Sequence, residues 1–233
     1  MQTCVADART IIARTGPLKL GVPMQIAIVL YPGFTALDVV GPYEVLKLMP
    51  DAEVRFVAHE EGPVLADSGA LSILATGTFA DVERPDIVLV PGSSNSTTAA
   101  MEDPVLQEWL VKVHETTTWT TSVCTGALVI GAAGILRGLP ATTHWTVQDQ
   151  LADLGAESRP NDRIVRDGKV ATAAGVSAGI DLALWLAGEI CGEDRARMIQ
   201  LVIEYDPQPP FDSGHPRKVT EDFINRTFEA MVP

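Results

Sequence analysis

The sequence is poor in cysteine and in basic residues, and it has no long apolar run. Its three cysteines, Cys4, Cys124 and Cys191, form no Cys-x-x-Cys pair, which disfavours both a disulfide framework and a zinc site. The 17 basic residues against 30 acidic ones leave a net charge of -13, which argues against nucleic acid and anionic membrane as partners. No apolar stretch approaches the roughly 18–20 residues that cross a bilayer. No glycine-rich nucleotide-binding motif is present either, so we expect no metal and no cofactor.

The chain of 233 residues fits one domain with a short segment in front of it. That segment places Arg9, Arg14 and Lys19 among weakly apolar residues, without the continuous apolar core of a signal peptide. We therefore expect an N-terminal arm over residues 1–23, a domain over residues 24–233, and a cytoplasmic location. The odd number of cysteines agrees with a reducing compartment.

Candidate strands and helices alternate along the domain at the spacing of βαβ units, which predicts an α/β fold with a mostly parallel sheet. Strands are expected at Gln25–Tyr31, Glu53–Ala58, Asp86–Val90 and Trp119–Val123, with a hairpin of Ile164–Arg166 and Lys169–Thr172 around Asp167-Gly168. Helices are expected at Ala36–Leu48 with an interruption near Gly41-Pro42, and at Pro104–Glu115, Thr125–Leu136, Ser177–Ile190, Glu193–Tyr205 and Thr220–Met231.

Cys124 stands where a predicted buried strand meets a predicted buried helix. The run before it is β-rich, and the residues after it stay small or aliphatic until Arg137. The Ser-x-Cys-x-Gly pattern is similar to the nucleophile elbow Gly-x-Ser-x-Gly, with sulfur in place of the hydroxyl. Unpaired amides and the helix dipole stabilise a thiolate there, so we expect a thiol pKa below the ordinary value of about 8.5. A buried structural cysteine is the alternative.

Asp38 lies in an otherwise apolar stretch after the first predicted strand, between Leu37 and Val39. A carboxylate there is costly to bury unless it is hydrogen-bonded or protonated. The first strand and the strand before Cys124 are predicted to run in parallel. The segments after them therefore emerge at one edge of the sheet, where ligand sites form. Asp38 is a candidate functional group on this reasoning, and a helix N-cap is the alternative.

A third strand end, Val88–Ser96, runs into a loop of small residues. The backbone amides of Gly92 and Ser93 in this loop are candidates for stabilising a developing anion. His144 is a candidate general base, but a hydrogen-bonded packing histidine fits the sequence at least as well. A thiol, a carboxyl group and backbone amides at one edge of a sheet would act on a small-molecule substrate.

Together these stretches resemble the ThiJ/PfpI superfamily and, within it, most closely the isocyanide hydratases. The matching stretches cover nearly everything from Met24 to Phe211 and include Leu37-Asp38 with Gly41-Pro42, Met101–Pro104, Ser122–Gly126, Gly131–Gly134, Ala141–Trp145, Val165–Gly168, Ala178–Asp181 and Gln200–Phe211. The resemblance implies a flavodoxin-like three-layer sandwich of the class I glutamine amidotransferase type. It also implies a cofactor-independent lyase that hydrates an isocyanide to an N-substituted formamide. Cys124 would be its nucleophile, Asp38 the acid/base partner, and Thr125 a neighbour that supplies a hydroxyl and an amide.

Departures from other branches of the superfamily sharpen this expectation. PfpI-type peptidases carry a histidine directly after the cysteine, where Thr125 stands here. Deglycase-like relatives carry a glutamate at the position of Asp38. The hydratases carry an aspartate there, as this chain does. The usual Pro-Gly-Gly loop has Ser93 at its third position, and a positive φ there would strain serine. Regulators of the superfamily add a helix-turn-helix domain, for which Pro216–Pro233 is too short.

Two alternative functions remain beside the hydratase, and the resemblance also implies an oligomeric state. Cys124 could serve as a redox or ligand sensor without turnover, since a thiolate beside a carboxyl group can be held as a sulfenic or sulfinic acid. A deglycase-like activity is the second alternative. Relatives are commonly homodimers, which implies a homodimer here. Phe34, Leu37 and Pro207–Phe211 are expected to expose apolar surface for that contact.

Overall fold

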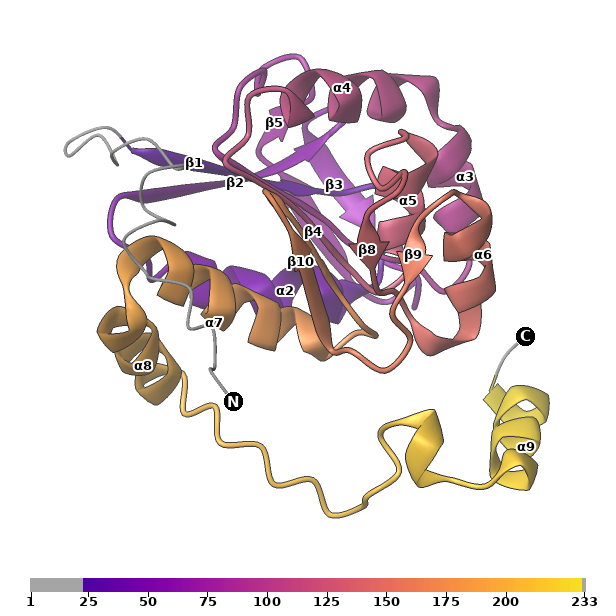
Figure 1. Ribbon diagram of the computed structural model, residues 1–233. Coiled ribbons are helices and arrows are strands. Elements are labelled where there is room, and N and C mark those ends of the chain that lie inside the picture. The colour runs from indigo at the N-terminus through magenta and orange to yellow at the C-terminus, as the bar shows by residue number, and fades with distance from the viewer. Residues whose placement is uncertain (1–22, 232–233) are drawn as a thin grey trace, which may run out of the picture.

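The computed structural model describes residues 23–231 and is built on one seven-stranded sheet in the order β10-β11-β7-β6-β1-β2-β5 (Figure 1). Neighbouring strands pair in parallel except β10, which is antiparallel to β11. The strands are β1 (Met24–Val29), β2 (Ala52–Ala58), β5 (Gly77–Thr78), β6 (Ile87–Val90), β7 (Trp119–Val123), β10 (Ile164–Asp167) and β11 (Val170–Ala173). The predicted mostly parallel sheet is confirmed.

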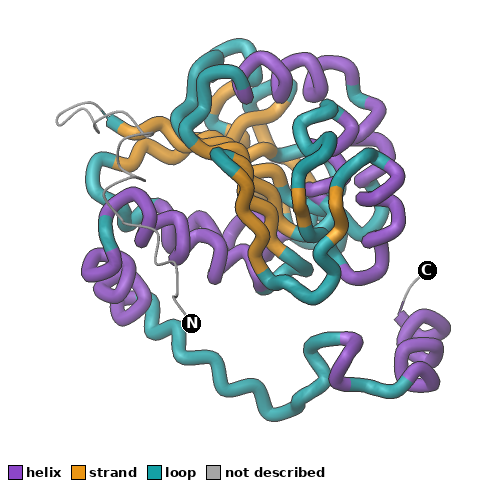
Figure 2. Tube along the Cα trace, in the orientation of Figure 1, coloured by secondary structure: helices purple, strands orange, loops and turns teal. Residues whose placement is uncertain are grey.

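Helices cover both faces of this sheet, which gives three layers (Figures 1 and 2). One layer contains α2 (Ala36–Leu46), α7 (Ala178–Cys191) and α8 (Glu193–Val202). The other contains α3 (Thr97–Glu102), α4 (Pro104–His114), α5 (Gly126–Ala132) and α6 (Gln148–Asp153). The central strands β6 and β7 are buried along their whole length because both faces of the sheet are covered.

Trp119 and Trp109 illustrate how the two helical layers are attached. The Trp119 ring at the start of β7 meets the Trp185 ring of α7 edge to face, with centroids 5.3 Å apart. On the opposite layer, Trp109 of α4 donates its indole N–H to the carbonyl of Val82 at 2.8 Å. Each tryptophan therefore fills apolar space, and the indole nitrogen of Trp109 finds an acceptor there.

Several predicted boundaries need correction. The helix α2 runs through Pro42 without interruption, because Pro42 packs closely against Gly179 of α7 and this contact outweighs the local cost of proline. The helix after Cys124 ends at Ala132, where Gly134 takes a positive φ of 78° and stops it. The turn of the β10–β11 hairpin consists of Gly168 and Lys169, one residue later than predicted, because Asp167 still pairs with Val170.

The structure also contains short elements without a strong sequence signal. Two of them form a hairpin beside β2, namely β3 (Gly62–Leu65) and β4 (Ser72–Ala75). The others are β8 (Pro140–Ala141), β9 (Glu157–Ser158) and the 3₁₀ turn η1 (Trp145–Val147). These strands have few residues and mixed burial, so the alternation that would reveal them is missing.

The chain leaves the sandwich after α8 and continues as a C-terminal arm, residues 206–231 (Figure 2). The arm contains an extended segment, the 3₁₀ turn η2 (Pro216–Lys218) and the helix α9 (Glu221–Met231). Phe34, predicted to be exposed, is fully buried in its own chain, whereas Leu37 and Phe211 are exposed. The predicted N-terminal arm lies, except for residue 23, outside the described residues. Within residues 23–231, no helix combines the length and apolar character that crossing a membrane requires.

Candidate active site

The candidate site lies at the carboxyl edge of the sheet, where the strand order reverses. The chain passes from β1 to β2 on one side and then to β6 on the other side of β1. Loops after β1 and β6 therefore diverge, and this divergence leaves room for a ligand. Asp38 follows β1, Gly92 follows β6 and Cys124 follows β7. The fold thus brings together three segments that are far apart in the sequence, as predicted.

Cys124 occupies a strained turn between β7 and α5. Its φ of 59° lies in the left-handed region, which costs a non-glycine residue on the order of 1–3 kcal/mol. The backbone amide of Cys124 donates to the Ala174 carbonyl at 2.9 Å, and its carbonyl accepts from the Thr143 hydroxyl at 2.9 Å. Gly126 allows the close turn, because a Cβ there would lie 2.2 Å from the Val90 carbonyl oxygen. These contacts hold Cys124 at the edge of the sheet, where the residue is 5% exposed.

Asp38 is fully buried in the first turn of α2, but it is not the N-cap, which is Thr35. Its Oδ2 accepts a hydrogen bond from the Gly92 amide at 2.8 Å. Its Oδ1 has no hydrogen-bond partner among the described residues. One carboxyl oxygen is therefore fixed, and the other is available to a proton or to a ligand.

Burial raises the pKa of Asp38 from 3.8 to about 7. The Gly92 amide and the Cys124 thiol act in the opposite direction, because both stabilise the carboxylate, and the nearby Asp67 carboxylate adds to the rise. The Asp38 carboxyl group therefore exchanges its proton near neutral pH. A group with this pKa can serve as an acid and as a base in one reaction cycle.

The expected low pKa of the cysteine is wrong. Burial and, to a smaller extent, the negative charge of Asp38 raise the pKa of the Cys124 thiol to about 12. The backbone amides of Val176 and Thr125 lower it, but they do not compensate for the lost solvation. The resting cysteine is therefore a neutral thiol. The stabilisation of a thiolate by the helix dipole and the backbone amides is therefore smaller than the opposing effects of burial and of the neighbouring carboxylate.

Thr125 connects the cysteine turn to the loop after β6. The Ser93 amide donates to the Thr125 hydroxyl at 2.8 Å, and that hydroxyl lies 2.7 Å from the Thr97 hydroxyl. Gly92 sits against both turn residues, since a Cβ on it would lie 2.5 Å from Thr125 Oγ1 and 3.0 Å from the Cβ of Cys124. Ser93 is outside the positive-φ region, so the serine causes no strain there.

The amides of Gly92 and Ser93 already have acceptors in the protein, namely Asp38 and Thr125. Their suggested role as donors to a bound anion therefore stays a prediction, and in this structure they hold the site together. The amides that act on the sulfur are those of Thr125 and Val176. Val176 was missed by the sequence reasoning, because nothing in a β-branched residue signals its positive φ of 29°.

His144 lies beside the site without reaching the thiol through a described hydrogen bond. Its ring covers Gly175, where a Cβ would lie 2.5 Å from His144 Cδ2. Its Nδ1 is 2.7 Å from the Thr146 hydroxyl, and burial lowers its pKa. This neutral, hydrogen-bonded ring fits the packing role better than that of a general base. Among residues 23–231, no group of histidine, cysteine, aspartate and glutamate side chains is arranged to hold a metal ion.

The charged side chains that act on Cys124 and Asp38 are both acidic. Asp38 acts on Cys124, and Asp67 acts on Asp38. The Asp67 carboxylate accepts hydrogen bonds from the hydroxyls of Thr35 at 2.7 Å and Ser94 at 3.1 Å. The site therefore combines a neutral nucleophile, a titratable carboxyl group and an acidic rim, which suits the transfer of a proton to a neutral substrate.

Comparison with known proteins places this site in context. A model of the DJ-1/PfpI family matches residues 24–189. The chain is 45% identical over 210 residues to the isonitrile hydratase of Pseudomonas putida, a match that covers 90% of this chain and 91% of that protein. The crystal structure of a ThiJ/PfpI family protein from Pseudomonas syringae has a TM-score of 0.83 and 36% identity, with 92% of each chain covered. DJ-1beta of Drosophila melanogaster shares the fold, with a TM-score of 0.72 and 19% identity over 80% of this chain and 100% of that chain.

Proposed function

The chain belongs to the DJ-1/PfpI (ThiJ) family, and from that membership and its cysteine site we propose that it is an isonitrile hydratase-like lyase. The reaction adds water to an isocyanide, R–N≡C, and yields the N-substituted formamide R–NH–CHO. Identity of 45% with an isonitrile hydratase along 90% of the chain supports this activity. Cys124 is the proposed nucleophile, Asp38 the acid/base group and Thr125 the residue that positions the thiol.

One observation carries the proposed mechanism: a buried thiol lies beside a buried carboxyl group, and one oxygen of this group has no hydrogen-bond partner among residues 23–231. Gly92 links the two groups, since its amide binds Asp38 Oδ2 and its Cα packs against the Cys124 turn. The carboxylate is itself one cause of the raised thiol pKa. Transfer of the thiol proton to Asp38 therefore removes the charge that opposes a thiolate. The Cys124 thiol can therefore become a nucleophilic thiolate when its proton moves to the Asp38 carboxylate.

In the first step, the Cys124 proton moves to Oδ1 of Asp38 as the sulfur attacks the terminal carbon of the isocyanide. Asp38 passes that proton to the same carbon, which gives the thioimidate R–N=CH–S–Cys124. An S–C bond and a C–H bond form, and the carboxylate is regenerated. The amides of Thr125 and Val176 stabilise the sulfur while it carries negative charge.

In the second step, Asp38 removes a proton from water, and the hydroxide adds to the thioimidate carbon. The proton goes to the nitrogen, so that the intermediate is R–NH–CH(OH)–S–Cys124. Collapse of this intermediate breaks the C–S bond, returns the thiol proton to sulfur and releases the formamide. The sum is one isocyanide plus one water, which requires no oxidant, reductant or cofactor.

Turnover of a simple isocyanide tests the proposal. The purified chain, with its free thiols titrated beforehand, is incubated with benzyl isocyanide, and N-benzylformamide is quantified by mass spectrometry. Cys124→Ala is expected to lower kcat/KM by at least about 1,000-fold, as loss of a nucleophile does. Asp38→Asn is expected to lower it by about 100-fold or more. Cys191→Ser is the matched control and keeps the wild-type rate. No formamide at high concentrations of an enzyme with intact thiols would end the assignment.

A sensor without turnover is less well supported than the enzyme. Thiol oxidation proceeds through the thiolate, which burial and the Asp38 charge disfavour in the resting site. Intact mass after mild peroxide treatment separates the two functions. Selective oxygen addition at Cys124 together with absent hydratase activity would favour the sensor.

We infer a reducing, cytoplasmic setting from the unpaired cysteines Cys124 and Cys191.

A further inference from the structure

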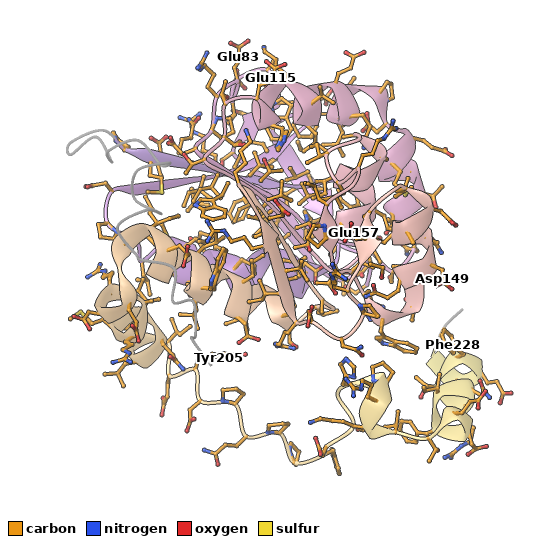
Figure 3. All side chains as sticks on the ribbon, in the orientation of Figure 1. Glu83, Glu115, Asp149, Glu157, Tyr205 and Phe228 are labelled. Atoms are coloured by element: carbon orange, nitrogen blue, oxygen red, sulfur yellow. The ribbon has the colours of Figure 1, made fainter. Side chains whose placement is uncertain are left out.

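Tyr31 is a buried polar side chain beside the site that takes no part in the reaction steps of Cys124 and Asp38. It follows β1 directly and is 4% exposed. Its hydroxyl donates a hydrogen bond to the carbonyl oxygen of Pro91 at 2.9 Å, across 60 residues of sequence. Side chains fill the space between the sheet and both helical layers, so a buried phenol must find its acceptor within the protein (Figure 3). The acceptor that Tyr31 uses lies next to the candidate site.

The acceptor belongs to the peptide group that binds Asp38. The carbonyl of Pro91 and the amide N–H of Gly92 are the two polar ends of one planar peptide group. At one end the carbonyl accepts from the Tyr31 hydroxyl, and at the other end the N–H donates to Asp38 Oδ2 at 2.8 Å. Both hydrogen bonds are buried. One rigid unit therefore connects the phenol to the carboxyl group.

This connection has a definite effect on the carboxyl group. A donor to a peptide oxygen draws electron density from the N–H, which then becomes a stronger donor itself. The Gly92 amide lowers the pKa of Asp38 because it stabilises the carboxylate, so the Tyr31 hydroxyl acts in the same direction through it. Burial, followed by the charges of Asp38 and Cys124, raises the pKa of Tyr31 well above the ordinary value of a phenol. Tyr31 therefore keeps its proton and remains a donor at neutral pH.

Few other groups act on Asp38. The titratable ones are Cys124, in the turn after β7, and Asp67, in the turn between β3 and β4. The helix α7 packs against α2 and places the uncharged Ile180 against Gly41. The four acidic residues labelled in Figure 3 are exposed, whereas Asp38 is the only fully buried acid among residues 23–231. A change in the Gly92 hydrogen bond should therefore be visible in the titration of this carboxyl group.

We propose that Tyr31 is a positioning residue, which holds the Pro91–Gly92 peptide group so that its amide binds one oxygen of Asp38 and leaves the other oxygen to exchange the proton. Tyr31 acts through this peptide group and transfers no proton itself. The inference rests on the proposed acid/base role of Asp38. The Thr35 amide donates to the Gly92 carbonyl at 2.8 Å, so the loop stays attached to the start of α2 when the phenol hydroxyl is removed.

The pKa of Asp38 in Tyr31→Phe tests the proposal, because this substitution keeps the ring and removes only the hydroxyl. The full chain, labelled with carbon-13 at the aspartate carboxyl groups, is titrated by NMR, and Asp38→Asn identifies the signal. Tyr31→Phe is expected to raise the Asp38 midpoint by about 0.3–1 pH unit. Asp67→Asn is expected to lower it in the same titration. Tyr43→Phe is the matched control: it removes a phenol hydroxyl from α2, where the ring packs on Phe56, and should leave the midpoint unchanged.

A second arm strengthens the hydrogen bond instead of removing it, and it keeps the test valid if Tyr31→Phe does not fold. Replacement of all three tyrosines by 3-fluorotyrosine makes the phenol a stronger donor, so the Asp38 midpoint is expected to fall. An unchanged or lowered midpoint in folded Tyr31→Phe overturns the proposal. So does a midpoint that does not fall in the fluorotyrosine protein.

Turnover provides a readout that a merely structural role would not produce. In Tyr31→Phe, kcat/KM for benzyl isocyanide is expected to fall about 2–10-fold at pH 6, where the raised midpoint protonates more of Asp38, and to change much less at pH 9. An equal loss at both pH values would mean that Tyr31 only supports the fold, and it would overturn the proposal. The NMR titration requires no substrate, so failure of the hydratase assignment and failure of this inference are distinguishable.

Discussion

Asp38 and Cys124 form a pair in which each group sets the protonation of the other. The carboxylate raises the thiol pKa, and the thiol lowers the carboxyl pKa. At neutral pH the resting pair holds the thiol proton and has a partly ionised Asp38. The proposed reaction starts from the form with a neutral thiol and an ionised carboxylate. The fraction of enzyme in that form determines the rate at low substrate concentration.

The pH profile of kcat/KM tests this protonation state. Below the Asp38 pKa of about 7, the rate is expected to fall tenfold per pH unit, and above it to level off. Asp67→Asn removes a neighbouring negative charge that raises this pKa, so the midpoint is expected to move to lower pH. A profile that is flat between pH 5 and 9, or a midpoint that rises in Asp67→Asn, contradicts this account of the site.

The same raised pKa predicts a cost in stability. The carboxyl pKa is higher in the folded state than the ordinary 3.8, so its stabilising contribution is complete below pH 3.8 and is lost as the pH rises through about 7. Asp38→Asn keeps an acceptor for the Gly92 amide but cannot ionise. Its free energy of unfolding relative to wild type is therefore expected to rise by about 2–3 kcal/mol between pH 5 and pH 9. Urea titrations at the two pH values measure this change, and an unchanged difference would mean that Asp38 is not buried as described.

At the scale of residues, the sequence predicted the positions of the two site residues correctly, but it did not predict the pKa of the thiol. Asp38 and Cys124 stand out because a carboxylate between apolar residues and a cysteine after a buried strand are both unusual. The thiol pKa could not be predicted, because it depends on the depth of burial and on a carboxylate 86 residues earlier in the chain. The positive φ of Val176 likewise follows from packing and not from residue type.

At the scale of elements, the site depends on the close approach of the loop after β6 to the turn after β7. Gly92→Ala tests this contact, because its Cβ would lie 2.5 Å from Thr125 Oγ1 and 2.6 Å from the Thr125 nitrogen. The displaced turn is expected to lower kcat/KM by about 100-fold, as misplacement by about 1 Å does. Gly77→Ala in β5 is the control, since its nearest new contact would be 3.8 Å away. Activity of Gly92→Ala within threefold of wild type would contradict the positioning role of this contact.

The elements themselves were predictable where burial is uniform. Strand β7 was predicted with its observed bounds, Trp119–Val123, because the run is rich in residues that favour strands and ends directly before the turn at Cys124. The uninterrupted α2 was not predictable, because the packing of Pro42 on Gly179 joins segments 137 residues apart. The β3–β4 hairpin has short strands with mixed burial, so its pattern resembles that of a loop.

At the scale of the whole molecule, the sheet order places the ends of β1, β6 and β7 at one point of its carboxyl edge. This placement turns three ordinary strand ends into a single site, and it follows from parallel pairing with a reversal of strand order at β1. The C-terminal arm is the part of the molecule that the body leaves uncovered. The sequence indicated its apolar Phe211 correctly, but it wrongly assigned Phe34 to the same exposed surface.

The central claim is that Cys124 forms a covalent intermediate with an isocyanide. Rapid mixing of the full chain with excess benzyl isocyanide, followed by acid quench and intact mass spectrometry, tests it most directly. The account predicts a transient gain equal to the full mass of one isocyanide, located on the peptide that contains Cys124, which forms and decays fast enough to account for formamide production. The adduct should be absent from Cys124→Ala and unchanged in Cys191→Ser. Formamide production at the wild-type rate by Cys124→Ala, or an adduct located only on Cys191, would contradict the claim.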